Sequence, residues 1–160
     1  MHKLDKDFFA QAFALKQLDR AGWLRAGIQN PESVAAHSWG LALLCLKLAP
    51  KDLDLQRVLS IALVHDLPEV IAGDITPHDG FSKQEKQAFE LKAAQELLPP
   101  DLYVLWLEYE ENQTKEAQFV HQMDKLDMLI QAENYAQKAD TSEFIISAKE
   151  KLKNDFGDLC

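Results

Sequence analysis

Cysteine is scarce in this sequence. The 160 residues include two cysteines, Cys45 and Cys160, which form neither a disulfide framework nor the paired spacing of a metal-binding motif. Cys45 lies in an apolar segment and is expected to be a small core residue, whereas Cys160 is the last residue. Low cysteine usage is typical of proteins in a reducing compartment, so we expect a cytoplasmic protein.

Long apolar runs are also absent. A membrane-spanning helix needs roughly 20 mainly apolar residues, and no run in this sequence approaches that length. The first residues, Met1 to Asp7, carry charges where an export signal needs an apolar segment. We therefore expect no membrane partner and no export signal.

Basic residues are outnumbered. Lysine and arginine together number 17 against 26 acidic residues, and the formal net charge is −9. A protein that binds nucleic acid through its phosphates needs a basic surface, so nucleic acid is not an expected partner. A small anionic substrate is compatible with this charge only if arginine, lysine or a metal offsets it locally.

The sequence has no alternating strand pattern, no repeat and no low-complexity linker, whereas helical spacing of apolar residues recurs. With 47% hydrophobic residues, the chain can form one sizeable core. We expect an all-α single-domain bundle over residues 1–160, with a loop at 20–31. The predicted helices cover about residues 5–19, 33–49, 54–72, 83–98, 101–111, 115–138 and 142–155.

The segment from Val58 to Asp74 combines an apolar helix with ionisable side chains. His65 and Asp66 stand where buried residues should continue, and a buried carboxylate is costly unless it is paired or bound to metal. Glu69 follows His65 by four residues, so it lies on nearly the same helix face. This concentration of charge at the end of an apolar helix predicts a functional site.

The same segment contains signals for bending and ending a helix. Pro68 lacks an amide donor and should kink the helix just after His65 and Asp66. Gly73 is a plausible C-cap, which places Asp74 in the loop that follows.

Two further residues on other predicted helices extend this site. His37 lies near the start of one helix and Asp124 inside another. Alone, His37 could be a hydrogen-bonded core histidine and Asp124 a helix-face carboxylate, with Asp127 as an alternative on the same face. Together with His65 and Asp66 they suit a divalent ion such as Zn, Mn, Co or Fe, and helical bundles often hold metals between facing helices.

The order His37, His65-Asp66, Asp124 resembles the H…HD…D pattern of the HD-domain metal-dependent phosphohydrolases. The sequence is more closely similar to the bacterial 5′-deoxynucleotidases and their eukaryotic HD-domain-containing protein 2 relatives. The segments that carry this likeness are Asn30–His37, Leu63–Glu69, Gly73–Pro77 and Phe119–Asp124. The resemblance covers about residues 10–137.

This resemblance implies roles for individual residues. His37, His65, Asp66 and Asp124 would ligate one divalent ion (Co, Mn, Zn, Fe or Mg), leaving positions for water and phosphate. The remaining implied catalytic residues are Glu69 and Asp74, which match positions beside the reacting phosphate, and the sequence does not separate which of them handles the proton.

The resemblance also implies a phosphate clamp in the loop before the second predicted helix. Arg20 matches the family arginine, and its planar guanidinium suits a phosphate. Arg25 is a rival, because Ala21-Gly22 separates Arg20 from Trp23 here. Trp23 could pack on the nucleotide or on the core.

One position departs from the family pattern. Relatives usually carry an acidic residue just before the first histidine, where this chain has Ala36. Loss of that acid could soften the metal site or change its metal preference without removing a ligand. The other histidines, His2, His78 and His121, match no family role and are expected at the surface.

The expected function is metal-dependent hydrolysis of (deoxy)nucleoside 5′-monophosphates, with a small nucleotide as the substrate. The alternatives are hydrolysis of a triphosphate, a cyclic nucleotide or a guanosine polyphosphate, and a non-catalytic helical protein with a structural metal. The family also suggests a homodimer, for which exposed aromatic residues at Tyr103, Trp106 and Tyr109 would be a sign, although these could equally be core.

Overall fold

The computed structural model describes residues 5–152, and within that range it contains helices and no β-strand. This confirms the all-α prediction. The elements are α1 (Lys6–Ala12), a 3-10 helix η1 (Phe13–Lys16), α2 (Ala21–Arg25), α3 (Val34–Leu48), α4 (Leu55–Val64), α5 (Glu69–Ala72), α6 (Lys83–Leu97), α7 (Pro100–Glu111), α8 (Lys115–Tyr135) and α9 (Ser142–Lys151).

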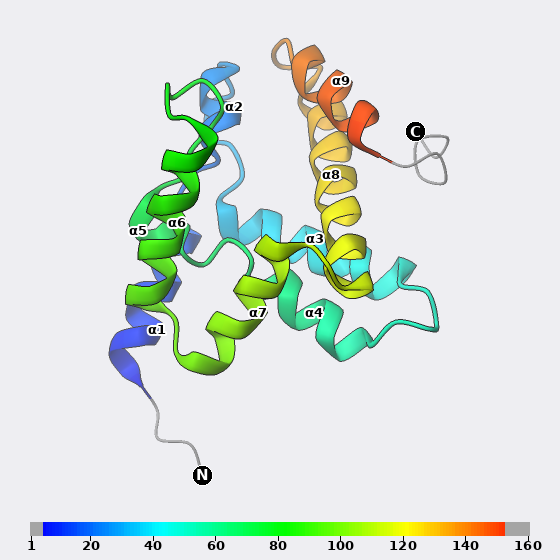
Figure 1. Ribbon diagram of the computed structural model, residues 1–160. Helices are drawn as coiled ribbons and strands as arrows, with labels where there is room; N and C mark the ends of the chain where they lie inside the picture. The colour runs from blue at the N-terminus through cyan, green and yellow to red at the C-terminus, as the bar shows by residue number, and fades with distance from the viewer. Residues whose placement is uncertain (1–4, 153–160) are drawn as a thin grey trace.

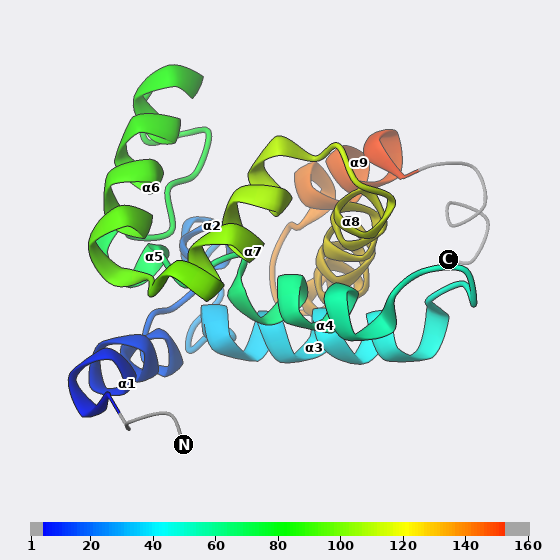
Figure 2. The ribbon, with the colours of Figure 1, turned by 60° about the horizontal axis from the view of Figure 1, so that its bottom comes forward.

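Helices α3 and α4 lie side by side and form one edge of the molecule (Figure 2). Helix α8 packs against both of them, and α9 runs along α8. On the other side, α5 packs against α6, and α7 lies between α6 and α8 (Figure 1). The main core fills the space among α3, α4, α7, α8 and α9, with fully buried Leu41, Ile61 and Leu129 at its centre.

Side-chain caps fix where the helices begin. Ser33 accepts the amide of Ala36 at the start of α3, and Asp54 does the same for Arg57 at the start of α4. Ser82 forms a complete capping box at the start of α6. These three starts agree with those predicted from the sequence.

The predicted helix 54–72 is broken rather than kinked. Helix α4 ends at Val64, and α5 begins only after Pro68, which is its N-cap. Proline cannot donate the backbone hydrogen bond that a continuous helix needs at this point. His65 and Asp66 therefore lie in the break itself. Gly73, with φ of 81°, ends α5 as predicted.

The predicted loop 20–31 is wrong in part, because it contains the short helix α2. Trp23 in this helix is only 2% exposed and packs against Tyr135 and Phe144. Burial of this large side chain offsets the low helix propensity of Gly22. Gly27, with φ of 87°, follows the end of the helix.

Other boundaries differ by a few residues. The first predicted helix tightens after Ala12 into η1, and the helix predicted to 138 ends at Tyr135. The last predicted helix ends at Lys151, with Leu152 as its C-cap, and residues 153–155 of its expected continuation lie outside the described residues, as do His2 and Cys160. No helix within residues 5–152 is both long and apolar enough to cross a membrane.

The aromatic residues of α7 are not an exposed group. Trp106 and Tyr109 are buried, which corrects the idea that they mark a subunit surface, and Tyr103 is partly buried.

Cys45 is buried in the main core, as predicted.

Candidate active site

The four predicted metal ligands converge from three parts of the chain. His37 comes from α3, His65 and Asp66 from the break after α4, and Asp124 from α8. Nε2 of His37 lies 3.2 Å from Oδ1 of Asp124 and 3.6 Å from Oδ2 of Asp66. Nε2 of His65 lies 3.0 Å from the same Asp66 oxygen.

The donor atoms of this cluster fit a divalent ion. Ligand atoms of His37, His65 and Asp124 all lie within 4.8 Å of one another. Both imidazole Nε2 atoms are buried and lack a hydrogen-bond partner among the residues described. A buried polar atom without a partner is costly, and a cation between two imidazoles and two carboxylates would remove that cost.

The electrostatics of the cluster favour positive charge. Burial alone would raise the pKa of Asp66, but His65 and His37 hold that pKa at about 2. Burial and Arg20 lower the pKa of His37, yet the carboxylates of Asp124 and Asp127 raise it to about 9. A metal ion would take the place of a proton in this cluster.

Glu69 and Asp74 lie beside the cluster. Glu69, at the start of α5, is 8% exposed, and its Oε2 has no hydrogen-bond partner within residues 5–152. Burial, together with the charges of Asp66 and Asp74, raises its pKa well above the usual range. Oδ2 of Asp74 accepts the amide of Ala21 at 2.7 Å, which fixes the loop after α5 to the start of α2.

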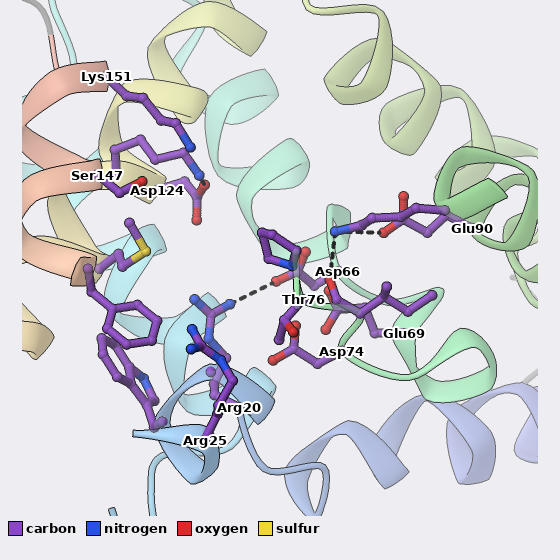
Figure 3. A pocket seen from close by; sticks show the side chains of 18 of the residues that line it. Arg20, Arg25, Asp66, Glu69, Asp74, Thr76, Glu90, Asp124, Ser147 and Lys151 are labelled. Atoms are coloured by element: carbon purple, nitrogen blue, oxygen red, sulfur yellow. Dashed lines mark hydrogen bonds and ion pairs between the residues drawn. The ribbon is translucent and has the colours of Figure 1, made fainter. Parts of the chain in front are cut away.

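The two candidate arginines occupy different environments (Figure 3). The guanidinium Nη1 of Arg20 lies 3.7 Å from Oδ2 of Asp66, so Arg20 reaches the cluster of candidate metal ligands. Burial alone would lower the pKa of Arg20, but the charges of the surrounding carboxylates, Asp66 and Asp74 foremost, together raise it by more than burial lowers it. The net pKa is therefore raised, and the guanidinium keeps its charge. Arg25 instead pairs with Glu143 of α9 at 3.3 Å, in an exposed position.

Trp23 is buried and packs against aromatic side chains of the core. Its ring lies 5.4 Å from that of Tyr135 and 4.5 Å from that of Phe144, and its indole N–H donates to Oε1 of Glu32 at 2.9 Å. With the nitrogen and most of the ring engaged in the core, Trp23 offers little surface to a nucleotide. Its predicted contact with substrate stays untested.

A cavity of about 470 Å³ opens beside the cluster and is lined by Asp66, Glu69, Asp74 and Asp124. Its walls carry six basic side chains, of which the sequence analysis singled out only the two arginines. They are Arg20, Arg25, Lys83, Lys86, Lys125 and Lys151. The lysines lie on α6, α8 and α9 and share no local motif, so only the folded arrangement groups them. Three further acidic side chains, Glu90, Glu110 and Glu143, also line the cavity. The basic groups alone therefore give no net positive charge, and an anionic substrate would also need the charge of a bound divalent ion.

Tyr109 on α7 contacts Asp124, and His121 on α8 packs on Tyr109. The Tyr109 hydroxyl donates to Oδ2 of Asp124 at 3.5 Å, and its ring packs on His65 at 4.9 Å. His121 stacks on Tyr109 at 3.9 Å and its Nε2 lies 2.9 Å from the Tyr109 carbonyl. His121 is therefore partly buried, which corrects the expected surface position, whereas His78 is exposed and pairs with Glu143.

Comparison with known proteins gives a consistent set of relatives. The family model described as "HD domain" matches residues 12–159. The 5′-deoxynucleotidase HDDC2 of Homo sapiens is 41% identical over 128 residues, covering 76% of this chain and 63% of the human protein. The 5′-deoxynucleotidase hdd1 of Schizosaccharomyces pombe is 39% identical over 150 residues, covering 84% of this chain and 76% of the yeast protein. This chain therefore spans less than two thirds of the human relative's length.

A solved structure shares the fold. A conserved hypothetical protein from Pyrococcus furiosus superposes with a TM-score of 0.81 at 39% identity, covering 91% of this chain and 88% of that one. The two proteins thus share their arrangement of helices over most of both chains.

The ligand geometry predicts that a divalent ion stabilises the fold. At a free ion concentration of about 100 times Kd, binding adds about 2.7 kcal/mol, which corresponds to a rise in Tm of roughly 5–11 °C. Thermal unfolding of chelator-treated protein with and without Mn²⁺ or Co²⁺ measures this rise. His65→Ala should abolish most of it, and an equal rise in that variant would show that the ion binds elsewhere.

Proposed function

Because the chain belongs to the HD-domain family, we propose that it is a metal-dependent 5′-nucleotidase that hydrolyses (deoxy)nucleoside 5′-monophosphates to a nucleoside and phosphate. The observation that carries this proposal is the pair of unpartnered buried imidazole nitrogens facing two carboxylates, beside a cavity that is lined by both basic and acidic side chains. The relatives named 5′-deoxynucleotidase, at about 40% identity, support the substrate class.

His37, His65, Asp66 and Asp124 would hold the ion. A divalent ion bound there supplies Lewis acidity toward the phosphate and lowers the pKa of water. Arg20, next to Asp66 and fixed in charge, is placed to bind the phosphate oxygens.

The reaction forms a bond between a water oxygen and phosphorus and breaks the bond from phosphorus to the 5′ oxygen of the nucleoside. The water loses a proton and the departing 5′ oxygen gains one. Glu69 is placed to handle a proton, because its carboxyl is buried beside Asp66 and its Oε2 has no other partner in the described chain. Asp74, held by the amide of Ala21, is placed to support Glu69 or the sugar.

The main alternative is a phosphohydrolase acting on a triphosphate, a cyclic nucleotide or a guanosine polyphosphate. A chain with one arginine-bearing loop offers few basic groups to a long polyphosphate. The four lysines of the cavity weaken that argument, so the names of the relatives carry the preference for monophosphates. A non-catalytic metal protein is disfavoured, since a structural site does not need Glu69 unpartnered beside it.

Phosphate release tests the proposed reaction. Protein stripped with a chelator should release phosphate from deoxynucleoside 5′-monophosphates only after Co²⁺, Mn²⁺, Zn²⁺ or Mg²⁺ is restored, and matched ribonucleotides measure the sugar preference. Release of pyrophosphate from triphosphates, with no release from monophosphates, would favour the alternative substrate class. Metal binding without hydrolysis of any phosphoester would favour the non-catalytic protein.

The two arginines give a matched test of the phosphate clamp. Arg20→Ala should lower kcat/KM by about 10- to 150-fold at saturating metal, since it removes a charge-assisted contact worth about 1.5–3 kcal/mol. Arg25→Ala should lower it by less than about 5-fold, because an exposed ion pair contributes little. Steady-state phosphate release distinguishes them, and the reverse ranking would make Arg25 the clamp.

We also propose a homodimer, formed through one exposed face of α3. Trp39, Leu43 and Leu46 follow each other at helical spacing and are 67%, 50% and 55% exposed. Helix α3 contains no acidic residue, although the net charge is −9. Two copies can therefore meet along this face without placing like charges opposite each other.

Light scattering coupled to size-exclusion chromatography tests this surface. The native protein should elute with the mass of two chains, and Leu43→Glu should shift it to one chain, because a charge then lies in the apolar contact. Val104→Glu on α7 is the control, since Val104 is similarly exposed, at 53%, but lies on another helix. A monomeric native protein, or a dimer unaffected by Leu43→Glu, would contradict the proposal.

The cytoplasmic location is also proposed. Cys45 is buried and forms no disulfide within the described range, and a chain with so few cysteines suits a reducing compartment.

A further inference from the structure

The two ring nitrogens of His37 face different partners. Nε2 points toward Asp124 and Asp66 in the metal cluster. Nδ1 lies 2.6 Å from Oδ2 of Asp127, a short hydrogen bond to a carboxylate that comes from α8, one turn after Asp124. The ring is fully buried, so no water competes for either nitrogen.

From this geometry we infer that Asp127 is a positioning residue for the metal site, an inference that rests on the ligand set of the proposed function. Asp127 accepts the Nδ1–H of His37, which leaves the lone pair of Nε2 free to face the ion. A neutral imidazole can carry its proton on either nitrogen, and the carboxylate selects the tautomer that can ligate. It also fixes the orientation of the ring.

This position of Asp127 separates it from the ligands. Asp124 and Asp127 share one face of α8, so the sequence allowed either to bind the metal. In the structure Asp124 approaches Nε2 of His37 and Asp127 approaches Nδ1, on the opposite side of the ring. The two carboxylates therefore have different tasks although they are neighbours on one helix.

Gly40 provides the space for this carboxylate. It lies on α3 one turn after His37, and a Cβ atom built at this position would collide with Oδ1 of Asp127. Any larger residue must displace the carboxylate, so the glycine here serves packing rather than an unusual backbone angle. Glycine inside a helix is less favourable than alanine, so α3 carries this cost at Gly40.

The contact between Asp127 and His37 also bears on Ala36, which stands where relatives usually carry an acidic residue. In relatives an acid at this position could orient a ligand, but here residue 36 is exposed, and its amide binds Ser33. His37 is instead oriented from α8. A second carboxylate, Glu32, also comes close to His37 and Asp127, but the indole N–H of Trp23 donates to it.

The test measures metal affinity directly. Dissociation constants for Co²⁺ and Mn²⁺ alone, obtained by competition with a chelator, should rise about 10- to 100-fold in Asp127→Asn. Gly40→Ala, which keeps every polar group but displaces the carboxylate, should show a loss in the same direction. Glu133→Gln is the control: this carboxylate also lies on α8, is 41% exposed, and makes only a 3.9 Å ion pair with Lys149.

Two further readouts separate positioning from folding and from catalysis. Thermal unfolding in the presence of chelator should show that both variants fold without metal, and activity lost at limiting metal should be recovered in part when the metal is raised to saturation. In ¹⁵N-histidine-labelled protein, the strongly hydrogen-bonded Nδ1 proton of His37 should shift upfield in Asp127→Asn, because an amide oxygen is a weaker acceptor than a carboxylate oxygen.

An unchanged dissociation constant in folded Asp127→Asn and Gly40→Ala overturns the inference. If the native protein binds neither ion, the proposed metal site itself fails, which is a distinct result. Should Asp127→Asn not fold, Gly40→Ala decides alone, because alanine favours the helix.

Discussion

The structure depends on the mutual attraction of two imidazoles and two carboxylates that are buried together. They belong to His37, His65, Asp66 and Asp124. Each of these groups is costly to bury alone, and together they offset one another. His37 and His65 depress the pKa of Asp66, and Asp124 and Asp127 raise that of His37. For these contacts to form, α3, the break after α4, and α8 must meet at one point, and this requirement sets the packing of the core around it.

Much of the fold was predictable, because the signals that determine it are local. The helix starts at Ser33, Asp54 and Ser82 follow from the chemistry of side-chain caps, and the confirmed helices follow from apolar spacing. The four candidate ligands were predictable because they fall in motifs. The break at Pro68 was only partly predicted: a proline disfavours a helix, but whether the chain kinks or breaks depends on what surrounds it.

The errors have a common cause in contacts between distant residues. Helix α2 forms because Trp23 is buried against Tyr135 and Phe144, which lie more than a hundred residues away. The burial of Tyr109 and the half-burial of His121 depend on each other and on Asp124. The lysines of the cavity share no motif, so their grouping is a property of the tertiary structure.

The convergence of the candidate ligands also has a consequence for the unfolded chain. An ion held by His37, His65, Asp66 and Asp124 would connect three segments that are far apart in sequence. It would act as a reversible cross-link that closes two long loops in a chain in which Cys45 forms no disulfide within the described residues. The loop between Asp66 and Asp124 is the longer of the two, so its closure costs the more entropy and would gain the more from the ion.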